Sequence, residues 1–491
     1  MQLNSVLSKA KQMPSLAIFL ITAILIVITP LFSAPPTIYL FILFLLALIL
    51  PLFLLKDKLS TNSLIIILFS LGFILRLAYV MYTGVYERQH DVETFGGGIG
   101  HSGYIEYFYN NFIVLPKFDV REVWQFYHPP LHHIIAAAFM RILTALGMDY
   151  MVACESLQML SLLYSALTML VCYKLLRALK LKDTALCIGF AIIAFHPTFI
   201  VFSGSINNDP LSVLFMLLAL LYSISWYNNP TYKNIIKIAF SIGFGMFTKL
   251  SAWMVAVPVA LIFLFAFITN KEVTRKNYFF QFVVFAVICI PIGLFWSIRN
   301  YILYEVPFTY IPMLSSDNPQ FVGYLSPINR LFDFSLYQFE SVFDMWGDPY
   351  FEFNPTVGLL KTAMFGEWIN ATDYPSISVI GIIIFWLGSI LCLISVIAFI
   401  KAVIKNCRKN HIFFALGSFF FTIVVMYYYF CISFPFTCTQ NIRYAVPLIL
   451  LGAFGIGYAY SKGGRIIKTI MLTLTILFSV FSSLTYFLIG M

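Results

Sequence analysis

Long apolar stretches separated by short polar or basic segments dominate this chain. Runs of about 20 residues can cross a bilayer as helices, because a helix rises about 1.5 Å per residue and the hydrocarbon core is roughly 30 Å thick. About thirteen such runs occur, near residues 14–33, 37–55, 63–82, 150–173, 184–203, 210–227, 235–250, 251–269, 278–297, 376–400, 411–431, 443–460 and 466–489. The pattern therefore predicts an all-α polytopic membrane protein.

The composition changes what kinds of protein need to be considered. Hydrophobic residues make up 61% of the 491 residues, charged residues make up 10%, and the mean hydropathy is +0.90. Soluble domains carry about 25% charged residues, so a cytosolic enzyme, a secreted module and a nucleic-acid reader are excluded. An outer-membrane barrel is excluded because its strands would alternate over about 10 residues. Cys431 and Cys438 flank one short segment, where they either pair or stay free thiols.

The basic residues predict how the chain lies in the membrane. With the N-terminus inside, 20 of the 30 Lys and Arg residues fall in cytoplasmic segments. Only Asp57, Asp183 and Glu272 of the 21 acidic residues do so. This distribution satisfies the positive-inside rule. It predicts that two long segments, residues 83–130 and 298–375, are both extracytoplasmic.

The apolar segment from Leu131 to Leu146 is too short to be counted with the spans. Sixteen helical residues extend roughly 24 Å, which is less than the hydrocarbon core. Its apolar positions recur at helical spacing, with polar or small residues between them. Counting it as a span would also invert every later loop and break the charge rule. We therefore expect a juxtamembrane amphipathic helix at the outer interface.

The first long outer segment and the start of this helix hold most of the histidines. Five of the seven histidines fall between residues 90 and 133, namely His90, His101, His128, His132 and His133. Asp91 and Glu93 lie in the same stretch. The adjacent His132 and His133 point to different helix faces, and no H-E-x-x-H spacing is present. A divalent metal is therefore an open alternative and not an indicated cofactor.

A second group of candidate residues is cationic. Four basic residues lie at or near the outer ends of separate predicted spans, namely Arg76, Lys249, Arg299 and Arg443. One such residue would be explained by snorkelling, in which a long side chain reaches the headgroups. Four at one membrane level indicate instead a cavity that binds an anion. Lys249 is the strongest candidate because it joins two short apolar runs, and Asn208 and Asp209 open another span at this level.

An acidic, histidine-rich loop that faces a cationic pocket suits transfer from a lipid phosphate. A carboxylate can take the proton of an incoming nucleophile, and this assistance is typically worth about 10²–10⁴ in rate. Cations stabilise the charge that develops on a phosphate leaving group. The two groups of residues together therefore predict an enzyme at the outer membrane surface.

Asp91 in the first outer loop is followed by His128-Pro129-Pro130-Leu131, which opens a helix. Further short motifs occur before and after that loop, in the order Arg76-Leu77, Asn208-Asp209-Pro210, Thr248-Lys249, Trp296-Ser297-Ile298-Arg299-Asn300 and Arg443-Tyr444. The order of these elements resembles the GT-C superfamily of polyprenyl-phosphate-sugar-dependent glycosyltransferases, particularly the protein O-mannosyltransferases and the bacterial aminoarabinose transferases that modify lipid A. The likeness runs from about residue 63 to residue 460.

The resemblance implies inverting transfer of a hexosyl or pentosyl group from a polyprenyl-phosphate sugar to a lipid, glycan or protein acceptor. It implies an extracytoplasmic active site on a bacterial cytoplasmic membrane. The implied catalytic residues are Asp91 as general base, Glu93 and His128. The implied ligands of the donor phosphate are Lys249, Arg299, Arg443 and Arg76. The implied acceptor or site-shaping residues are His90, His101, Tyr127, Asn208 and Asp209.

The resemblance also implies a division of the chain. Residues 1–62 are two additional N-terminal spans, and residues 63–297 are the transmembrane core, including the catalytic outer loop 83–147. Residues 298–375 are the second outer loop, and residues 376–491 are the C-terminal spans.

A transporter or flippase of lipid-linked sugars is the alternative function, because it would also need many spans and a cationic pocket. Such proteins keep functional charges near the midplane, whereas these charges collect near the outer surface.

Overall fold

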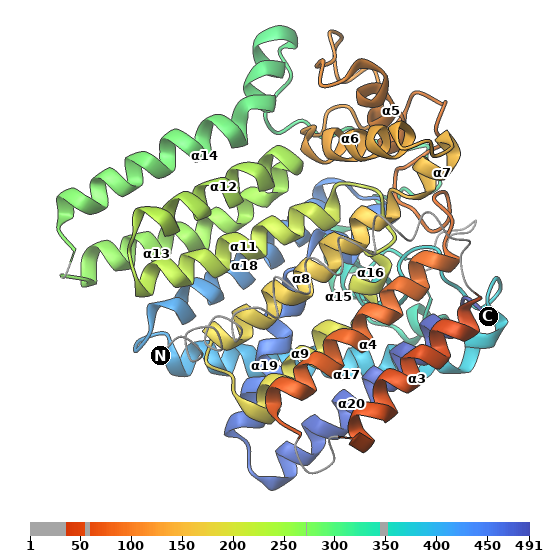
Figure 1. Ribbon diagram of the computed structural model, residues 1–491, viewed down its shortest axis with the longest axis vertical. Coiled ribbons are helices and arrows are strands. Elements are labelled where there is room, and N and C mark those ends of the chain that lie inside the picture. Colours follow the sequence, from red (N-terminus) through yellow and green to blue (C-terminus); the bar gives the residue numbers. More distant parts are fainter. Residues whose placement is uncertain (1–35, 55–58, 272, 344–351) are drawn as a thin grey trace.

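The computed structural model describes residues 36–54, 59–271, 273–343 and 352–491. Over these residues the chain forms helices and no strand, and one isolated bridge pairs Phe321 with Phe436. The helices of the first half (Figure 1) are α3 (Thr37–Leu54), α4 (Thr61–Tyr82), α5 (Gly100–Asn111), α6 (Leu131–Ala145), α7 (Tyr150–Glu155), α8 (Gln158–Ala178), α9 (Asp183–Phe195), α10 (Pro197–Val201), α11 (Asp209–Asn228) and α12 (Tyr232–Thr248). Those of the second half are η2 (Leu250–Val255), α13 (Ala256–Thr269), α14 (Arg275–Tyr304), α15 (Pro327–Phe332), η3 (Leu336–Phe339), α16 (Pro355–Phe365), η4 (Pro375–Ile377), α17 (Ser378–Asn406), α18 (His411–Ser433), η5 (Thr437–Gln440), η6 (Ile442–Tyr444), α19 (Leu448–Lys462) and α20 (Arg465–Leu488).

The predicted all-α polytopic fold class is confirmed. Nine helices of the described ranges are long and apolar enough to cross a membrane. The predicted span at 14–33 lies outside the described residues. The predicted spans at 184–203, 235–250 and 443–460 form shorter helices, namely α9 with α10, α12 and α19. The count of thirteen spans therefore stays a prediction.

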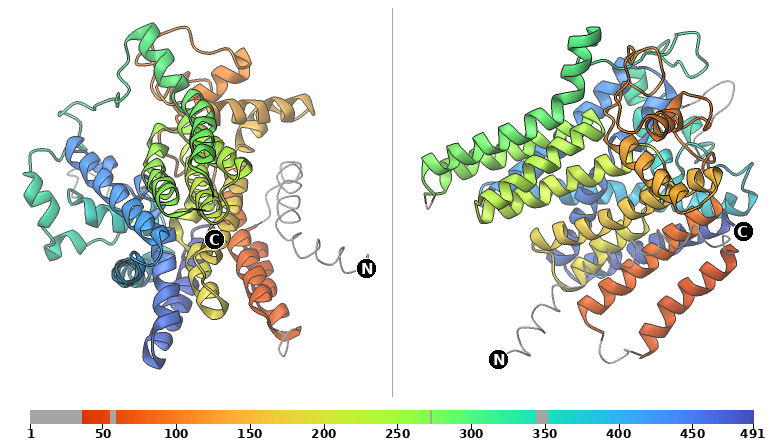
Figure 2. Two further views of the ribbon diagram at one scale, coloured as in Figure 1. Left: turned by 90° about the vertical axis from the view of Figure 1, so that its left-hand side faces the viewer. Right: turned by 45° about the horizontal axis from the view of Figure 1, so that its top comes forward.

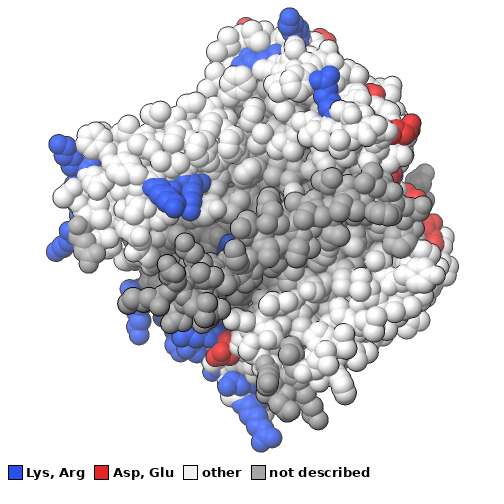
Figure 3. Space-filling model, in the orientation of Figure 1, with Lys and Arg blue, Asp and Glu red and all other residues white. Residues whose placement is uncertain are grey.

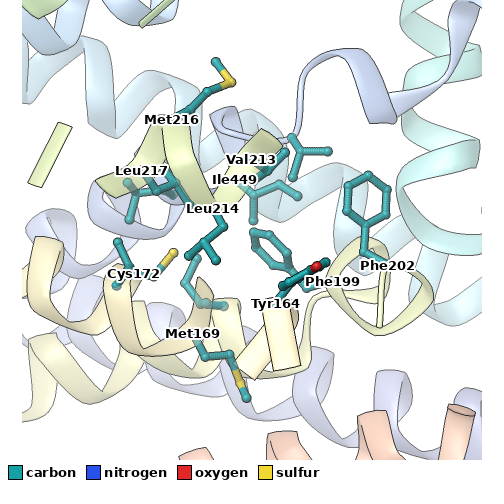
Figure 4. Close-up of a cluster of buried hydrophobic side chains, with 14 of the residues drawn as sticks. Tyr164, Met169, Cys172, Phe199, Phe202, Val213, Leu214, Met216, Leu217 and Ile449 are labelled. Atoms are coloured by element: carbon teal, nitrogen blue, oxygen red, sulfur yellow. The ribbon is translucent and has the colours of Figure 1, made fainter. Parts of the chain in front are cut away.

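A buried apolar core joins helices that are far apart in the sequence. Helix α11 packs on α8 and α12, α12 packs on α14, and α19 packs on α9 and α17. Figure 4 shows side chains of α8, α10, α11 and α19, with the residue after α10, meeting in this core: Tyr164, Met169, Cys172, Phe199, Phe202, Val213, Leu214, Met216, Leu217 and Ile449. This packing fixes where α11 begins, and Asp209 lies at that point.

The two long loops lie at the same end of the helical bundle. Helices α5 and α6 of the first loop, and α15 and α16 of the second, lie toward this end in Figure 1 and in the right-hand view of Figure 2. On the face shown in Figure 3, Lys and Arg gather mainly at the left and lower edges, and most Asp and Glu lie toward the right. The fold thus brings residues of both loops together around one end of the bundle.

Helix α6 begins directly after Pro129 and Pro130, as the sequence predicted. Proline fixes its own backbone and restricts the residue before it, which defines the start of a helix. The buried face of α6 carries His132 and His133, whereas Ile142 on its outer face is 58% exposed. Its amphipathic character is therefore present, and its place at the membrane interface stays a prediction.

Candidate active site

The loop that carries Asp91 is closed tightly against the first turn of α5. The backbone carbonyls of Asp91 and Val92 accept hydrogen bonds from the N–H groups of His101 (2.9 Å) and Ser102 (3.0 Å). These N–H groups belong to the first helical turn and have no partner within the helix. Asp91 has a φ of +59°, and Gly100 has a φ of +74°. A Cβ at Gly100 would come within 2.5 Å of the Val92 oxygen, so this close approach requires glycine.

The carboxylate of Asp91 forms an ion pair with Arg443, from the other end of the sequence. Arg443 Nη1 lies 2.9 Å from Asp91 Oδ2, and the two side chains are 8% and 29% exposed. Asn441 caps η6 by accepting the Arg443 N–H at 2.8 Å, which fixes the backbone of the arginine. Burial alone would raise the pKa of Asp91, but the charge of Arg443 and its hydrogen bond hold this pKa well below its usual range. Asp91 is therefore ionised.

His90 pairs with a carboxylate from the second long loop. His90 Nδ1 lies 3.1 Å from Glu367 Oε2, and both side chains are almost fully buried. The other Glu367 oxygen accepts a hydrogen bond from Asn441 Nδ2 at 2.5 Å. Burial would raise the pKa of Glu367, but His90, Arg443 and Asn441 lower it. Sequence reasoning missed Glu367 and Asn441, since neither belongs to a pattern that distinguishes it from nearby polar residues.

A second carboxylate–cation pair lies next to the first. Lys249 follows α12 directly and forms an ion pair with Asp209 at the start of α11. Asn208 Nδ2 donates to the carbonyl of the last residue of α12 at 3.0 Å, which joins the ends of these helices. The Tyr444 ring lies near both cations, 5.3 Å from Lys249 Nζ and 4.9 Å from the Arg443 guanidinium carbon. Two anions and two cations therefore meet around one tyrosine.

A column of histidine rings forms another wall of the site. The centres of the stacked His101 and His133 rings are 5.2 Å apart, and His101 Nδ1 lies 2.9 Å from His133 Nε2. The His128 ring stacks on that of His101 with 5.7 Å between the ring centres, and the centre of the Tyr127 ring lies 4.2 Å from that of His128. The indole of Trp296 in α14 donates to the Tyr127 carbonyl at 3.0 Å. Burial lowers the pKa of His101 to about 3 and those of His128 and His133 well below their usual range, so these rings are neutral.

Three candidate residues lie outside this cluster of charges. The Arg76 side chain is fully buried. Its guanidinium donates to the carbonyls of Gly72, Ala194 and Ile193 and to the Ser165 hydroxyl. All its nitrogens therefore already have protein partners.

Arg299 and Glu93 also have other surroundings. Arg299 donates to Asn300 Oδ1 at 2.6 Å and to the carbonyl of Pro116, and its guanidinium carbon lies 5.0 Å from the Trp296 ring. It thus holds the loop after α5 against α14. The side chain of Glu93 is exposed.

No metal cluster is formed in the described part of the chain. Among the described residues, no group of three or more His, Cys, Asp or Glu side chains is arranged so that it could hold a metal ion. Two of the site histidines are instead engaged with each other, through His101 Nδ1 and His133 Nε2. Cys431 and Cys438 are both free thiols.

Comparison with known proteins places this site in a known fold. Residues 127–296 match the family described as dolichyl-phosphate-mannose-protein mannosyltransferase. A search of curated proteins finds no match. The oligosaccharyltransferase AglB from Archaeoglobus fulgidus, solved with an inhibitory peptide and a dolichol-phosphate, is similar at a TM-score of 0.50 and 15% identity, over 88% of this chain and 56% of that one. This likeness shows a shared fold. The family match over residues 127–296 agrees with the predicted resemblance to the GT-C glycosyltransferase superfamily.

Two further solved structures are more distant. ArnT from Cupriavidus metallidurans has a TM-score of 0.48 and 11% identity, over 87% of this chain and 77% of that one. The protein O-mannosyltransferase Pmt1-Pmt2 complex of S. cerevisiae, bound to the sugar donor, has a TM-score of 0.37 and 14% identity, over 56% of this chain and 36% of that one. The chain thus spans about a third of the length of the yeast protein and about half that of AglB.

Proposed function

We propose that this protein is a membrane glycosyltransferase that moves a sugar from a polyprenyl-phosphate donor to an extracytoplasmic acceptor, with inversion. The observation that carries the proposal is the pairing of an ionised Asp91 with Arg443 beside Lys249. The matched family is named for dolichyl-phosphate-mannose, and AglB was solved with a dolichol-phosphate; both compounds are lipid phosphates. A site with both a base and phosphate-binding cations is what such a reaction requires.

Asp91 is the proposed general base toward the acceptor hydroxyl. Its carboxylate is ionised and 29% exposed, so it can reach and accept a proton. Arg443 makes it a weak base while the pair is intact, because the same positive charge that keeps Asp91 ionised also opposes its protonation. A donor phosphate that approached Arg443 would oppose this charge and raise the basicity of Asp91. The proposed order is therefore donor first and acceptor second.

Lys249 and Arg443 are the proposed ligands of the donor phosphate. They flank Tyr444 from two different helix junctions, and a phosphate above this ring could accept charge-assisted hydrogen bonds from both. Each cation already has a carboxylate partner, so the donor must share or displace it. Arg299 is proposed to position the loop after α5, and Arg76 to satisfy the carbonyls at the end of α9. We assign no step to the exposed Glu93.

The histidines are proposed to shape the acceptor site without adding charge. His101 and His128 form a neutral wall beside Asp91, and Tyr127 extends it. His90 joins Asp91 to Glu367 and so ties the first outer loop to the second. Asn208 fixes the α11–α12 junction that presents Asp209 and Lys249. The acceptor would then be oriented by hydrogen bonds and ring contacts.

The active site is proposed to face the outside of a bacterial cytoplasmic membrane. This orientation rests on the excess of basic residues in the other loops. The proposed division at residues 62, 297 and 375 does not separate functional units. Asp91 comes from the first outer loop, Glu367 from the second, and Arg443 from the C-terminal part.

The proposal is tested with purified full-length protein and a set of polyprenyl-phosphate sugars, with release of polyprenyl phosphate as the readout. Asp91→Asn removes the basic oxygen but keeps the shape, so we expect a loss of about 10²–10⁴ in turnover. Asp119→Asn is the matched control, because Asp119 also pairs with an arginine in the first outer loop, at 2.5 Å. Its turnover should be close to that of the wild type.

Two outcomes would contradict the proposal. Asp91→Asn protein that folds normally and turns over at the wild-type rate would remove Asp91 from the mechanism. If intact donor crosses the bilayer of vesicles that contain the protein, and no sugar is transferred to any acceptor, this result would favour a flippase instead.

A further inference from the structure

An open groove of about 790 Å³ lies between the end of α5 and the outer face of α6. Its walls include Tyr109, Asn110 and Phe112 on one side and Ala138, Arg141 and Thr144 on the other. None of these residues has a role in the proposed glycosyl transfer. The groove is therefore a separate feature of the first outer loop.

Arg141 is the only charged residue among the described residues that line the groove. Its guanidinium carbon lies 4.8 Å from the centre of the Phe112 ring and 5.9 Å from that of Tyr109. No carboxylate of the described ranges forms an ion pair with it. Stacking on aromatic faces leaves the N–H edge of a guanidinium available, and this edge matches a phosphate with two parallel hydrogen bonds.

The surface around the groove is apolar and continues into a membrane-spanning segment. Phe112 and Ile113 are 56% and 54% exposed, and Ile142 on α6 and Leu146 directly after it are 58% and 71% exposed. The apolar span of α7 and α8 begins at Tyr150, directly after this surface. An exposed apolar surface next to the start of a span is typical of a segment at the level of the lipid headgroups.

We propose that this groove binds the phosphate of an anionic phospholipid of the surrounding bilayer. Arg141 holds the phosphate, and the apolar rim contacts the glycerol and the first part of the acyl chains. The Tyr109 hydroxyl donates to Thr144 Oγ1 at 3.3 Å, and the Thr144 hydroxyl donates to the Met140 carbonyl at 3.1 Å, so these two side chains join α5 to α6 and leave Arg141 as the donor to the phosphate. A snorkelling arginine would reach any headgroup, whereas this site selects an anionic one and holds it between α5 and α6.

The probe is a photoactivatable phosphatidylglycerol in nanodiscs of phosphatidylcholine that contain the full-length protein. Mass spectrometry should locate the cross-link in residues 109–114 and 138–145. Arg141→Gln should reduce this cross-link about tenfold, because it removes a charge-assisted contact. Lys117→Gln is the matched control, since it removes one exposed charge from the same loop outside the groove. Ala138→Trp fills the groove without changing the charge and should cause the same loss, which keeps the test valid if Arg141→Gln does not fold.

Three results would overturn the proposal. Equal losses in Arg141→Gln and Lys117→Gln would show general charge attraction. Equal labelling by a photoactivatable phosphatidylcholine would show that the anion is not recognised. Displacement by an equal mole fraction of polyprenyl phosphate would assign the groove to the donor. None of these measurements requires glycosyl transfer, so the result is independent of the proposed function.

Discussion

Two carboxylate–cation pairs of this protein have the same chemistry and opposite electrostatic outcomes. Glu352 and Lys361 pair within the second outer loop and are 2% and 1% exposed. Asp91 and Arg443 come from distant parts of the chain, and Asp91 is 29% exposed. At Glu352, burial raises the pKa more than Lys361 lowers it. At Asp91, the charge and hydrogen bond of Arg443 outweigh burial, and the pKa falls well below its usual range.

The difference separates a structural pair from one that can take part in chemistry. The Glu352–Lys361 pair is sealed from solvent, so it offers no path for a substrate and serves to hold the structure. The Asp91–Arg443 pair is open to solvent on the side of Asp91. The Thr437 hydroxyl donates to the Glu352 carbonyl at 3.2 Å, so the second loop is joined to η5, just before Arg443. The sealed pair therefore supports the position of the open one. Of these two pairs, only the open one combines access with an ionised carboxylate.

The comparison of the two pairs is tested most strongly by removing the cation of each pair. Arg443→Ala should lower transfer by about 10²–10³, because it removes a group that stabilises charge on the leaving phosphate. Turnover is measured as release of polyprenyl phosphate, with thermal unfolding in detergent recorded in parallel. The variant should unfold close to the wild-type temperature, because the remaining Asp91 carboxylate is partly exposed.

Lys361→Ala is the counterpart in the sealed pair. It leaves Glu352 buried without its partner, which is expected to cost about 3–5 kcal/mol of stability. Replacing both residues, by Glu352→Gln with Lys361→Met, should restore much of this loss, and the folded protein should then turn over normally. If Lys361→Ala unfolds at the wild-type temperature while Arg443→Ala loses both stability and activity, the distinction between the pairs is wrong.

A smaller effect is expected on donor binding. Asp91 competes with the donor phosphate for Arg443 in the proposed order, so Asp91→Asn should bind polyprenyl phosphate about fivefold more tightly than the wild type. This factor corresponds to the free energy of a partly exposed ion pair. Binding is measured by microscale thermophoresis in detergent, with Asp119→Asn as the control that should not change. Equal or weaker binding by Asp91→Asn would show that the carboxylate and the phosphate do not compete.

The fold class and part of the site follow from sequence patterns, because they depend on apolar run length and on charge near helix ends. Lys249 and Arg443 were selected in this way, whereas Asp91 was selected from the histidine-rich outer loop and from the family resemblance, and the structure brings the three together. Glu367 and Asn441 could not be selected, since their role depends on contacts between segments that are remote in the sequence.

Arg76 shows a different limit of sequence reasoning. Its position near the end of a span suggested a ligand for an anion. Helix α9 ends at Phe195, before Pro197, and this break leaves carbonyls that lack partners within the helix. Arg76 donates to two of the carbonyls near this end, those of Ile193 and Ala194. A hydropathy pattern does not reveal whether a buried arginine faces a cavity or a broken helix.

The smallest expected effect is an absence of pH dependence on the acid side. A histidine with a lowered pKa takes up its proton only below that lowered value, so His101, with a pKa of about 3, stays neutral from pH 5 to pH 7. Asp91 stays ionised over the same range, because its pKa is lowered as well. The value of kcat/KM reports groups of the free enzyme, and neither group changes charge in this window. We therefore expect His101→Gln to alter the rate without altering the shape of the profile between pH 5 and pH 7. A step near pH 6.5 that is present in the wild type and missing in His101→Gln would show that His101 titrates during turnover, and the neutral histidine wall would then be wrong.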